Sequence, residues 1–307
     1  MRCPASVAVA ICAATAGFAA SPTQAQVAQA PLQSASPSSA ASASGVPFFA
    51  SGSPLVPGWS FSLGSYAWLS SVSSTVDTRT SGGGRTETDV HVPFGDLVEH
   101  LRFVGMAAGE VRYDRFSILT DFMYLNLGMS QSAAHLGSFD PGSGSIQIPV
   151  ALQTSASTGM GTTIWTLAGG YTVAAGPWGN IDVIAGTRLL AIDITTNYSL
   201  TADLGGSGGI MLAKNGSLGV NAENWDAIGG VTGRFAIPNS NFFVPYYFDV
   251  GTGDLPLTWQ AFTGLGYHAA TADYLLGYRY LAFENNSGAT VRKLEMGGLM
   301  AAATFHF

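Results

Sequence analysis

The chain is short of charge. Of its 307 residues only 10% are Asp, Glu, Lys or Arg, whereas an ordinary soluble domain has roughly 25%. The chain is also apolar on average, with 47% hydrophobic residues and a mean hydropathy of +0.27. A soluble fold of this size needs a charged surface, and this composition does not supply one. The sequence therefore predicts a protein that contacts lipid.

Long apolar runs are also missing. A membrane-spanning helix needs about 18 or more apolar residues in a row, and the one long run, residues 5–20, lies at the N-terminus. A bundle of membrane helices is excluded. The formal net charge is -7 and no basic cluster occurs, so nucleic acid is not expected as a partner. What remains is a protein that crosses lipid with strands.

The N-terminus has the pattern of an export signal. Arg2 precedes the apolar run, and Thr23-Gln24-Ala25 forms a small-residue cleavage site. We expect residues 1–25 to be a signal peptide read by the Sec pathway. Both cysteines, Cys3 and Cys12, fall inside it, so the mature chain would hold neither a disulfide nor a cysteine metal site. Residues 26–57 are rich in Ala, Ser, Gln and Pro and carry no charge, which predicts a disordered linker before one folded unit at 58–307.

The folded unit alternates with period two. Outward residues of a barrel in lipid must be apolar and inward ones are free to be polar, so charges within strands should share one parity. In segments such as 101–113, 181–189 and 225–237 they do. This parity places nine charges in the lumen: Arg102, Glu110, Arg112, Asp121, Arg188, Asp226, Arg234, Asp249 and Arg279.

A soluble β-sandwich with one wet face would alternate in the same way. Two features favour a membrane barrel. Aromatic residues gather near the strand ends and are expected to face outward as interfacial girdles; examples are Trp59, Tyr66, Trp68, Trp259 and Tyr267. The last residues alternate as well, and they end on Phe305 and Phe307.

At this point the sequence resembles the outer-membrane β-barrel proteins of Gram-negative bacteria. Its internal motifs are similar to those of a largely uncharacterised family of small barrels: Trp59-Ser60-Phe61, Tyr66-Ala67-Trp68-Leu69, Phe94-Gly95-Asp96-Leu97 and Asp121-Phe122-Met123-Tyr124-Leu125. The resemblance implies a place in the outer membrane, contact with lipid and lipopolysaccharide, and insertion by the barrel-assembly machinery. It also implies that Phe305 and Phe307 are part of the assembly signal.

The predicted fold is all-β, a transmembrane antiparallel up-and-down barrel of about ten strands. The strands are expected at 59–72, 101–113, 116–128, 160–174, 181–196, 225–237, 242–252, 257–268, 273–285 and 292–307. Short turns should alternate with long outer loops at 73–100, 129–159 and 197–224. The runs Thr86–Val92 and Gln147–Thr154 are strand-like, which leaves eight or twelve strands open, and 93–101 is either a short helix in the barrel mouth or a turn.

Sequence motifs for chemistry are weak. The five histidines, at positions 91, 100, 135, 268 and 306, show no metal-binding spacing, so neither a metal nor another cofactor is expected. Gly205-Gly206-Ser207-Gly208-Gly209 matches a nucleophile elbow, but no helix follows it. A hydrolase or protease site in the second outer loop is a lesser alternative; its residues would be Ser132, His135, Ser138 and Asp140.

The function predicted for a monomeric barrel of this kind is therefore not enzymatic. Nearly balanced charges in a small lumen favour an internal network of ion pairs that stabilises the barrel. The same residues would otherwise line a narrow passage for ions or small solutes. A third possibility is a surface protein that binds a partner through its long outer loops.

Overall fold

The structure is a computed structural model that describes residues 58–79, 85–139, 148–204, 210–285 and 291–307. The expected signal peptide and linker lie outside these residues. Among them, no helix is long and apolar enough to cross a membrane. The elements are β1 (Trp59–Arg79), β2 (Arg85–Val92), α1 (Phe94–Glu99), β3 (Leu101–Tyr113), β4 (Phe116–Phe139), β5 (Ile148–Gly176), β6 (Gly179–Leu204), β7 (Ile210–Ala236), β8 (Phe242–Gly253), β9 (Leu257–His268), β10 (Ala272–Glu284) and β11 (Val291–His306).

Ten of these strands form a closed antiparallel barrel. Each strand from β3 to β11 pairs with the next one along the chain, and β1 pairs with β3 on one side and with β11 on the other. The final contact is an exchange of two backbone hydrogen bonds between Phe61 and Phe307. Closure removes exposed strand edges, which lipid does not tolerate. The predicted count of ten is confirmed.

The run at 86–92 belongs to β2, which does not enter the barrel wall. It pairs with the far half of β1, from Val72 opposite Val92 to Arg79 opposite Arg85. The strand-like run at 147–154 is not an extra strand either, since β5 begins at Ile148 and runs through it. The stretch after β2 forms the helix α1, whose Leu97 is fully buried in the hydrophobic core.

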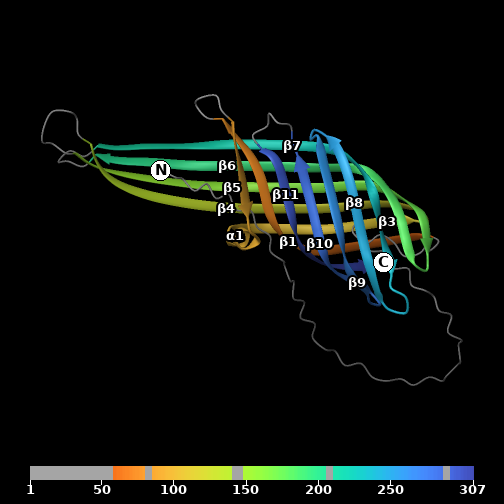
Figure 1. Cartoon of the computed structure of the whole chain (residues 1–307). Coiled ribbons are helices and arrows are strands. Elements are labelled where there is room, and N and C mark those ends of the chain that lie inside the picture. The colour runs from red at the N-terminus through yellow and green to blue at the C-terminus, as the bar shows by residue number, and fades with distance from the viewer. Residues whose placement is uncertain (1–57, 80–84, 140–147, 205–209, 286–290) are drawn as a thin grey trace, which may run out of the picture.

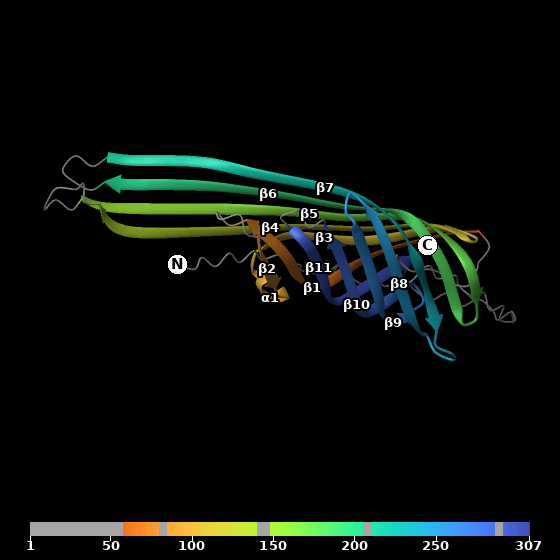
Figure 2. The same ribbon diagram turned by 45° about the horizontal axis from the view of Figure 1, so that its top comes forward.

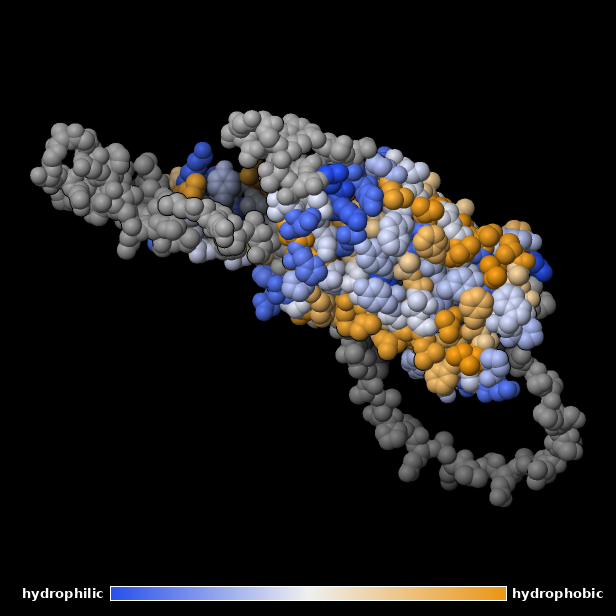
Figure 3. All heavy atoms as spheres, viewed as in Figure 1, coloured by the Kyte–Doolittle hydropathy of each residue, from blue (hydrophilic) through white to orange (hydrophobic). Residues whose placement is uncertain are grey.

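Side chains alternate between wall faces as the parity predicts. Within the part of the wall that would cross the membrane, most outward positions are exposed and apolar, and Figure 3 shows apolar residues spread over the outside of the barrel. Aromatic pairs lie near the two ends of this apolar band. One end has Trp59 against Tyr113, Phe116 against Tyr171 and Phe242 against Tyr267. The other has Trp165 against Trp225 and Trp259 against Tyr280. An aromatic border at each end of the apolar band suits a bilayer with two interfaces.

Four strands, β4 to β7, continue far beyond the barrel as a projecting sheet (Figures 1 and 2). They have 24 to 29 residues, whereas about 9–11 are enough to cross the hydrocarbon. Pairing stays in register throughout, from Phe116 opposite Tyr171 to Phe139 opposite Ile148. The prediction of long loops at 129–159 and 197–224 is therefore wrong, because most of these residues continue the strands.

At the opposite end the connections are short, as predicted. The β3–β4 turn is two residues, and its Asp114 adopts a φ of 50° while its carboxylate accepts a hydrogen bond from the backbone of Gly58. The β5–β6 turn uses Gly179 at a φ of 128°, which favours glycine. Short turns mark the periplasmic end of an outer-membrane barrel. The projecting sheet is accordingly on the cell surface.

Candidate functional site: an ion-paired lumen below an apolar vestibule

Eight of the nine charges assigned to the lumen are buried. Asp182 and Asp273, which share their parity, are buried with them, so four arginines and six carboxylates are enclosed. Arg102 is different: it is exposed and lies where the β3–β4 register shifts, between Leu101 and Phe103. The extra residue at this bulge interrupts the alternation, and a simple odd-even count carried past it assigns Arg102 wrongly.

One ion-pair network crosses the centre of the lumen from β10 to β1 and β4. Arg279 Nη2 lies 2.5 Å from Asp121 Oδ2, and its Nη1 donates to the Tyr66 hydroxyl at 3.0 Å. Tyr66 in turn donates to Asp121 Oδ1 at 2.6 Å. The guanidinium also lies over the Trp68 ring, 4.7 Å from its centroid. Charge-assisted hydrogen bonds of this kind are stronger than neutral ones.

The expectation that Tyr66 and Trp68 face outward in the aromatic girdle is therefore wrong. Both face the lumen rather than the lipid, with 9% and 0% of their surface exposed. They lie on the inward parity of β1, opposite to that of Trp59. An aromatic side chain fits either face of the wall, so the residue type alone does not assign Tyr66 and Trp68 to a face, whereas their position in the alternation of β1 does.

A second network joins β6 to β8. Arg188 binds both carboxylate oxygens of Asp249, donates to Thr258 at 3.2 Å and to Thr166 at 3.2 Å. Tyr247 donates to the same carboxylate at 2.5 Å. A bidentate arginine fixes its partner's orientation as well as its charge.

Two further groups lie nearer the periplasmic end. Arg112 lies 2.6 Å from Glu110 and 2.5 Å from Asp182. Arg234 lies 3.4 Å from Asp273.

Asp226 differs from the other carboxylates because it accepts the backbone N–H of Leu255, at 2.9 Å. The largest enclosed side chains include Trp68, Arg188, Arg279 and Tyr247, so the middle of the lumen is filled by the networks themselves.

Above these networks the lumen becomes apolar. Two adjoining cavities of about 280 and 220 Å³ share Ile192, Ile194, Val291 and Leu294 in their linings, and together they are called the vestibule here. The first is also lined by β1, β2, β4, β5 and β11 through Val72, Val90, Val92, Met123, Leu125, Met160 and Met296. The second adds the apolar Leu190, Val220, Leu255 and Phe283, and its lining also contains the polar residues Asn224, Glu284, Asn285, Arg292 and Lys293. Sequence reasoning missed the vestibule, although the inward parity of these strands turns apolar at this level.

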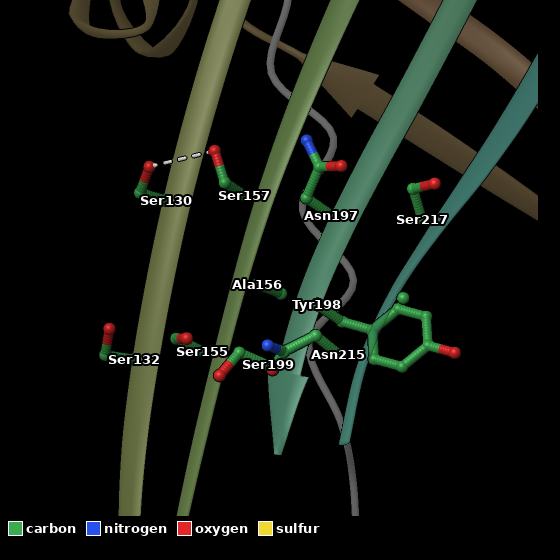
Figure 4. Close-up of a pocket in the computed structure, with 11 residues that line it drawn as sticks. Ser130, Ser132, Ser155, Ala156, Ser157, Asn197, Tyr198, Ser199, Asn215 and Ser217 are labelled. Atoms are coloured by element: carbon green, nitrogen blue, oxygen red, sulfur yellow. Dashed lines mark hydrogen bonds between the residues drawn. The ribbon is translucent and has the colours of Figure 1, made fainter. Parts of the chain in front are cut away.

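The outward face of the projecting sheet has the opposite character. Ser130, Ser157, Asn197 and Ser217 come from four neighbouring strands and line a shallow hollow (Figure 4). Ser130 donates to Ser157 at 3.4 Å. Of the proposed hydrolase residues, Ser132, His135 and Ser138 fall in β4 rather than in a loop, while Asp140 and the 205–209 motif lie outside the described residues.

A closed ten-stranded barrel with an apolar, aromatic-bordered exterior and short turns at one end is a transmembrane β-barrel of the outer-membrane type. The protein is an outer-membrane protein of this class.

Comparison with known proteins finds similarity only to solved structures, at low sequence identity and low TM-score. No protein-family model matches the chain, and no curated protein matches it significantly. Among solved structures, the translocator domain of the autotransporter NalP from Neisseria meningitidis aligns at 14% identity and a TM-score of 0.32, over 82% of this chain and 89% of its own. The attachment invasion locus protein Ail of Yersinia pestis aligns at 9% identity and a TM-score of 0.26, over 82% of this chain and 100% of its own. The Ralstonia pickettii toluene transporter TbuX aligns at 9% identity and a TM-score of 0.25, over 82% of this chain and 90% of its own.

Proposed function

We propose that this outer-membrane barrel binds a small apolar or amphipathic molecule in the vestibule at its outer mouth, above a lumen that does not conduct. The observation that carries the proposal is the order of the two zones along the lumen: an apolar chamber toward the cell surface and a filled, ion-paired region toward the periplasm.

The chemistry of the lining supports an apolar occupant. The cavity shared by β1, β2 and β4 to β6 is walled by valine, leucine, isoleucine and methionine, with a few serine and threonine hydroxyls. Small-molecule sites have this composition, predominantly apolar with few polar groups. Three of the lining residues, Met123, Met160 and Met296, are methionines, whose flexible side chains adapt to ligands of different shape.

Apolar residues continue onto the inner face of the projecting sheet. Leu218 and Val220 are 65% and 63% exposed, on the same parity as the vestibule lining of β7. Lipid does not explain them, because the outward face of the same strands is already polar at this height, with Asn197 and Ser217. Exposed apolar surface of this kind is typical of a binding groove. The sheet therefore supplies an apolar approach to the vestibule.

Photo-crosslinking in nanodiscs tests the proposal. The probe is an alkyl chain carrying a diazirine, and labelled peptides are mapped by mass spectrometry. Saturable labelling of inward residues such as Met160 and Leu294 is expected, with competition by the unlabelled chain. Labelling confined to outward, lipid-facing residues such as Val183 would overturn the proposal.

A matched pair of variants separates the vestibule from the bilayer. Ile194→Asn places an amide in the cavity, whereas Thr195→Asn changes the next residue, which is exposed on the other face. Labelling should fall at least about tenfold in the first variant, as expected for roughly 1.4 kcal/mol or more of lost binding, and stay unchanged in the second. Planar-bilayer recording adds an independent arm: discrete channels in the unaltered protein would contradict the closed lumen.

The projecting sheet favours a second candidate, binding of a polar surface partner through the Ser/Asn hollow. A carbohydrate such as the sugars of lipopolysaccharide has suitable chemistry, since the hollow offers hydroxyls and amides and little charge. Ser157→Ala together with Asn197→Ala should then reduce retention on a lipopolysaccharide column, and unchanged retention would refute this candidate.

A further inference from the structure

We infer that the periplasmic rim of the barrel holds a divalent transition-metal ion of the zinc type between His268, Asp273 and His306. The three residues come from the ends of β9, β10 and β11. Each offers one ligand atom, and the three atoms lie within 4.8 Å of one another. The inference is independent of the vestibule, which lies at the other end of the lumen.

The spacing of the donor atoms fits a metal ion. His268 Nδ1 lies 2.5 Å from Asp273 Oδ1, and His306 Nε2 lies 3.5 Å from the same oxygen. Zinc takes nitrogen ligands at about 2.0–2.1 Å and carboxylate oxygens at about 2.0–2.2 Å, so neighbouring ligands in a tetrahedral site stand roughly 3.3 Å apart. The observed separations lie on both sides of this value. Small side-chain movements bring the three atoms onto one ion.

His306 supplies a second, separate observation. Its side chain is 11% exposed, and both ring nitrogens are buried without a hydrogen-bond partner among the described residues. Buried polar atoms in native proteins nearly always have partners, and an orphaned atom calls for an explanation such as an unseen ion. A metal bound to Nε2 satisfies one of the two nitrogens.

The surroundings of Asp273 favour a ligand role. Arg234 Nη1 lies 3.4 Å from Oδ2, so the guanidinium contacts the oxygen that does not face the histidines. Metal-binding carboxylates are commonly held by such outer partners. Two imidazoles and one carboxylate suit zinc and its first-row neighbours, whereas magnesium and calcium prefer oxygen ligands.

The site is accessible from the periplasm. A cavity of about 220 Å³ at this rim is lined by His268, Arg234 and Phe243 together with the β5–β6 turn, and 35% of the His268 side chain is exposed. Water from the cavity completes the coordination. A bound ion would join three consecutive strands next to the β11–β1 closure of the barrel.

The test uses the untagged mature chain, folded in detergent or nanodiscs and freed of metal with a chelator. Cobalt(II) titration is expected to give a visible d–d band that saturates at one ion per chain, and zinc should displace it. Zinc should also raise the urea midpoint of unfolding, because a ligand that binds only the folded state stabilises it. Magnesium at the same concentration should do neither.

Three single variants give the decisive comparison. His268→Gln and His306→Gln should weaken cobalt binding by more than the roughly 10- to 100-fold typical of losing an outer partner. His100→Gln is the matched control, because this half-buried histidine contacts the Asp96 carbonyl at the other end of the barrel and lies outside the cluster. Equal binding by His268→Gln and the unaltered chain, or no band at all, would overturn the inference. His268 is the decisive position if His306→Gln fails to fold.

Discussion

Replacing Arg279 by methionine tests how the lumen is held together. The guanidinium is fully buried, lies 2.5 Å from Asp121, donates to Tyr66 and Gln260, and stacks on Trp68. Methionine keeps most of the volume of the side chain and removes its charge. Asp121, itself 2% exposed, then retains only the Tyr66 hydroxyl as a partner among the contacts described.

The expected cost is large because a buried carboxylate is left without its counter-charge. Breaking one side of a buried ion pair typically destabilises a protein by about 3–5 kcal/mol. Replacing both partners by apolar residues of similar size is often close to neutral. The double variant Arg279→Met with Asp121→Leu should therefore be more stable than Arg279→Met alone, and the coupling energy from the double-mutant cycle should exceed roughly 2 kcal/mol.

The free energy of unfolding is measured by urea titration in lipid vesicles, with tryptophan fluorescence and the heat-modifiable gel shift as two probes. Arg102→Met is the control, since Arg102 is exposed and surface changes usually stay within about 0.5 kcal/mol. A cost below about 1 kcal/mol for Arg279→Met, or costs of the two single changes that simply add, would refute the role given to this pair.

Three more results are expected. Gly179→Ala should lower the free energy of unfolding by about 1–3 kcal/mol, because Gly179 has a φ of 128° and an added Cβ would lie 1.9 Å from the Arg234 carbonyl oxygen. The control Gly169→Ala, whose Cβ would meet nothing nearer than 3.9 Å, should be nearly neutral. Equal unfolding midpoints for the two variants would contradict backbone strain at Gly179. Replacing 133–154 by an Asn-Gly turn, which Ser132 opposite Ser155 allows, should leave the gel shift and the midpoint of the barrel unchanged; loss of folding would mean that the projecting sheet helps to build the wall. Phe307→Ala should lower the inserted fraction in cell fractionation, whereas Leu276→Ala, also outward and exposed, should not, and equal fractions would argue against an assembly role for the terminal residue.

Period-two reasoning predicted the barrel wall well because lipid imposes a strict rule on it. Outward side chains must be apolar at every second position, so β3 and β9 were predicted with the bounds that the structure has, at 101–113 and 257–268. Closure between β1 and β11 also followed, since an open edge is not tolerated in lipid. The rule fails where the register shifts, as at Arg102.

The projecting sheet escaped prediction because the rule ends at the interface. Above the girdle, the outward residues of β4 to β7 become serine, threonine and asparagine, a composition typical of loops. The strands continue there through their backbone pairing, from Asn197 opposite Ser157 and Ser217 onward. No outward apolar pattern remains to reveal them.

The rim cluster could not be found from spacing along the chain. His268 and Asp273 are cross-strand partners at the start of the β9–β10 pairing, and His306 reaches them from the adjacent strand β11. Metal-site patterns in sequence depend on ligands close together on a helix or loop. In a barrel the neighbours are set by register, so ligands distant in sequence meet only after the strands are aligned.

The two faces of the wall change character at the same height but in opposite directions. Toward the cell surface the outer face goes from aromatic and aliphatic residues, such as Trp165, to serine and asparagine, because lipid ends there. The inner face goes from arginine and aspartate to isoleucine, leucine and methionine. Stability alone favours polar residues where a strand projects into water, and exposed Leu218 and Val220 lie on that inner face instead. The end of the lipid accounts for the change on the outer face, and the apolar occupant proposed above would account for the change on the inner face, whereas a wide aqueous passage would need a polar mouth.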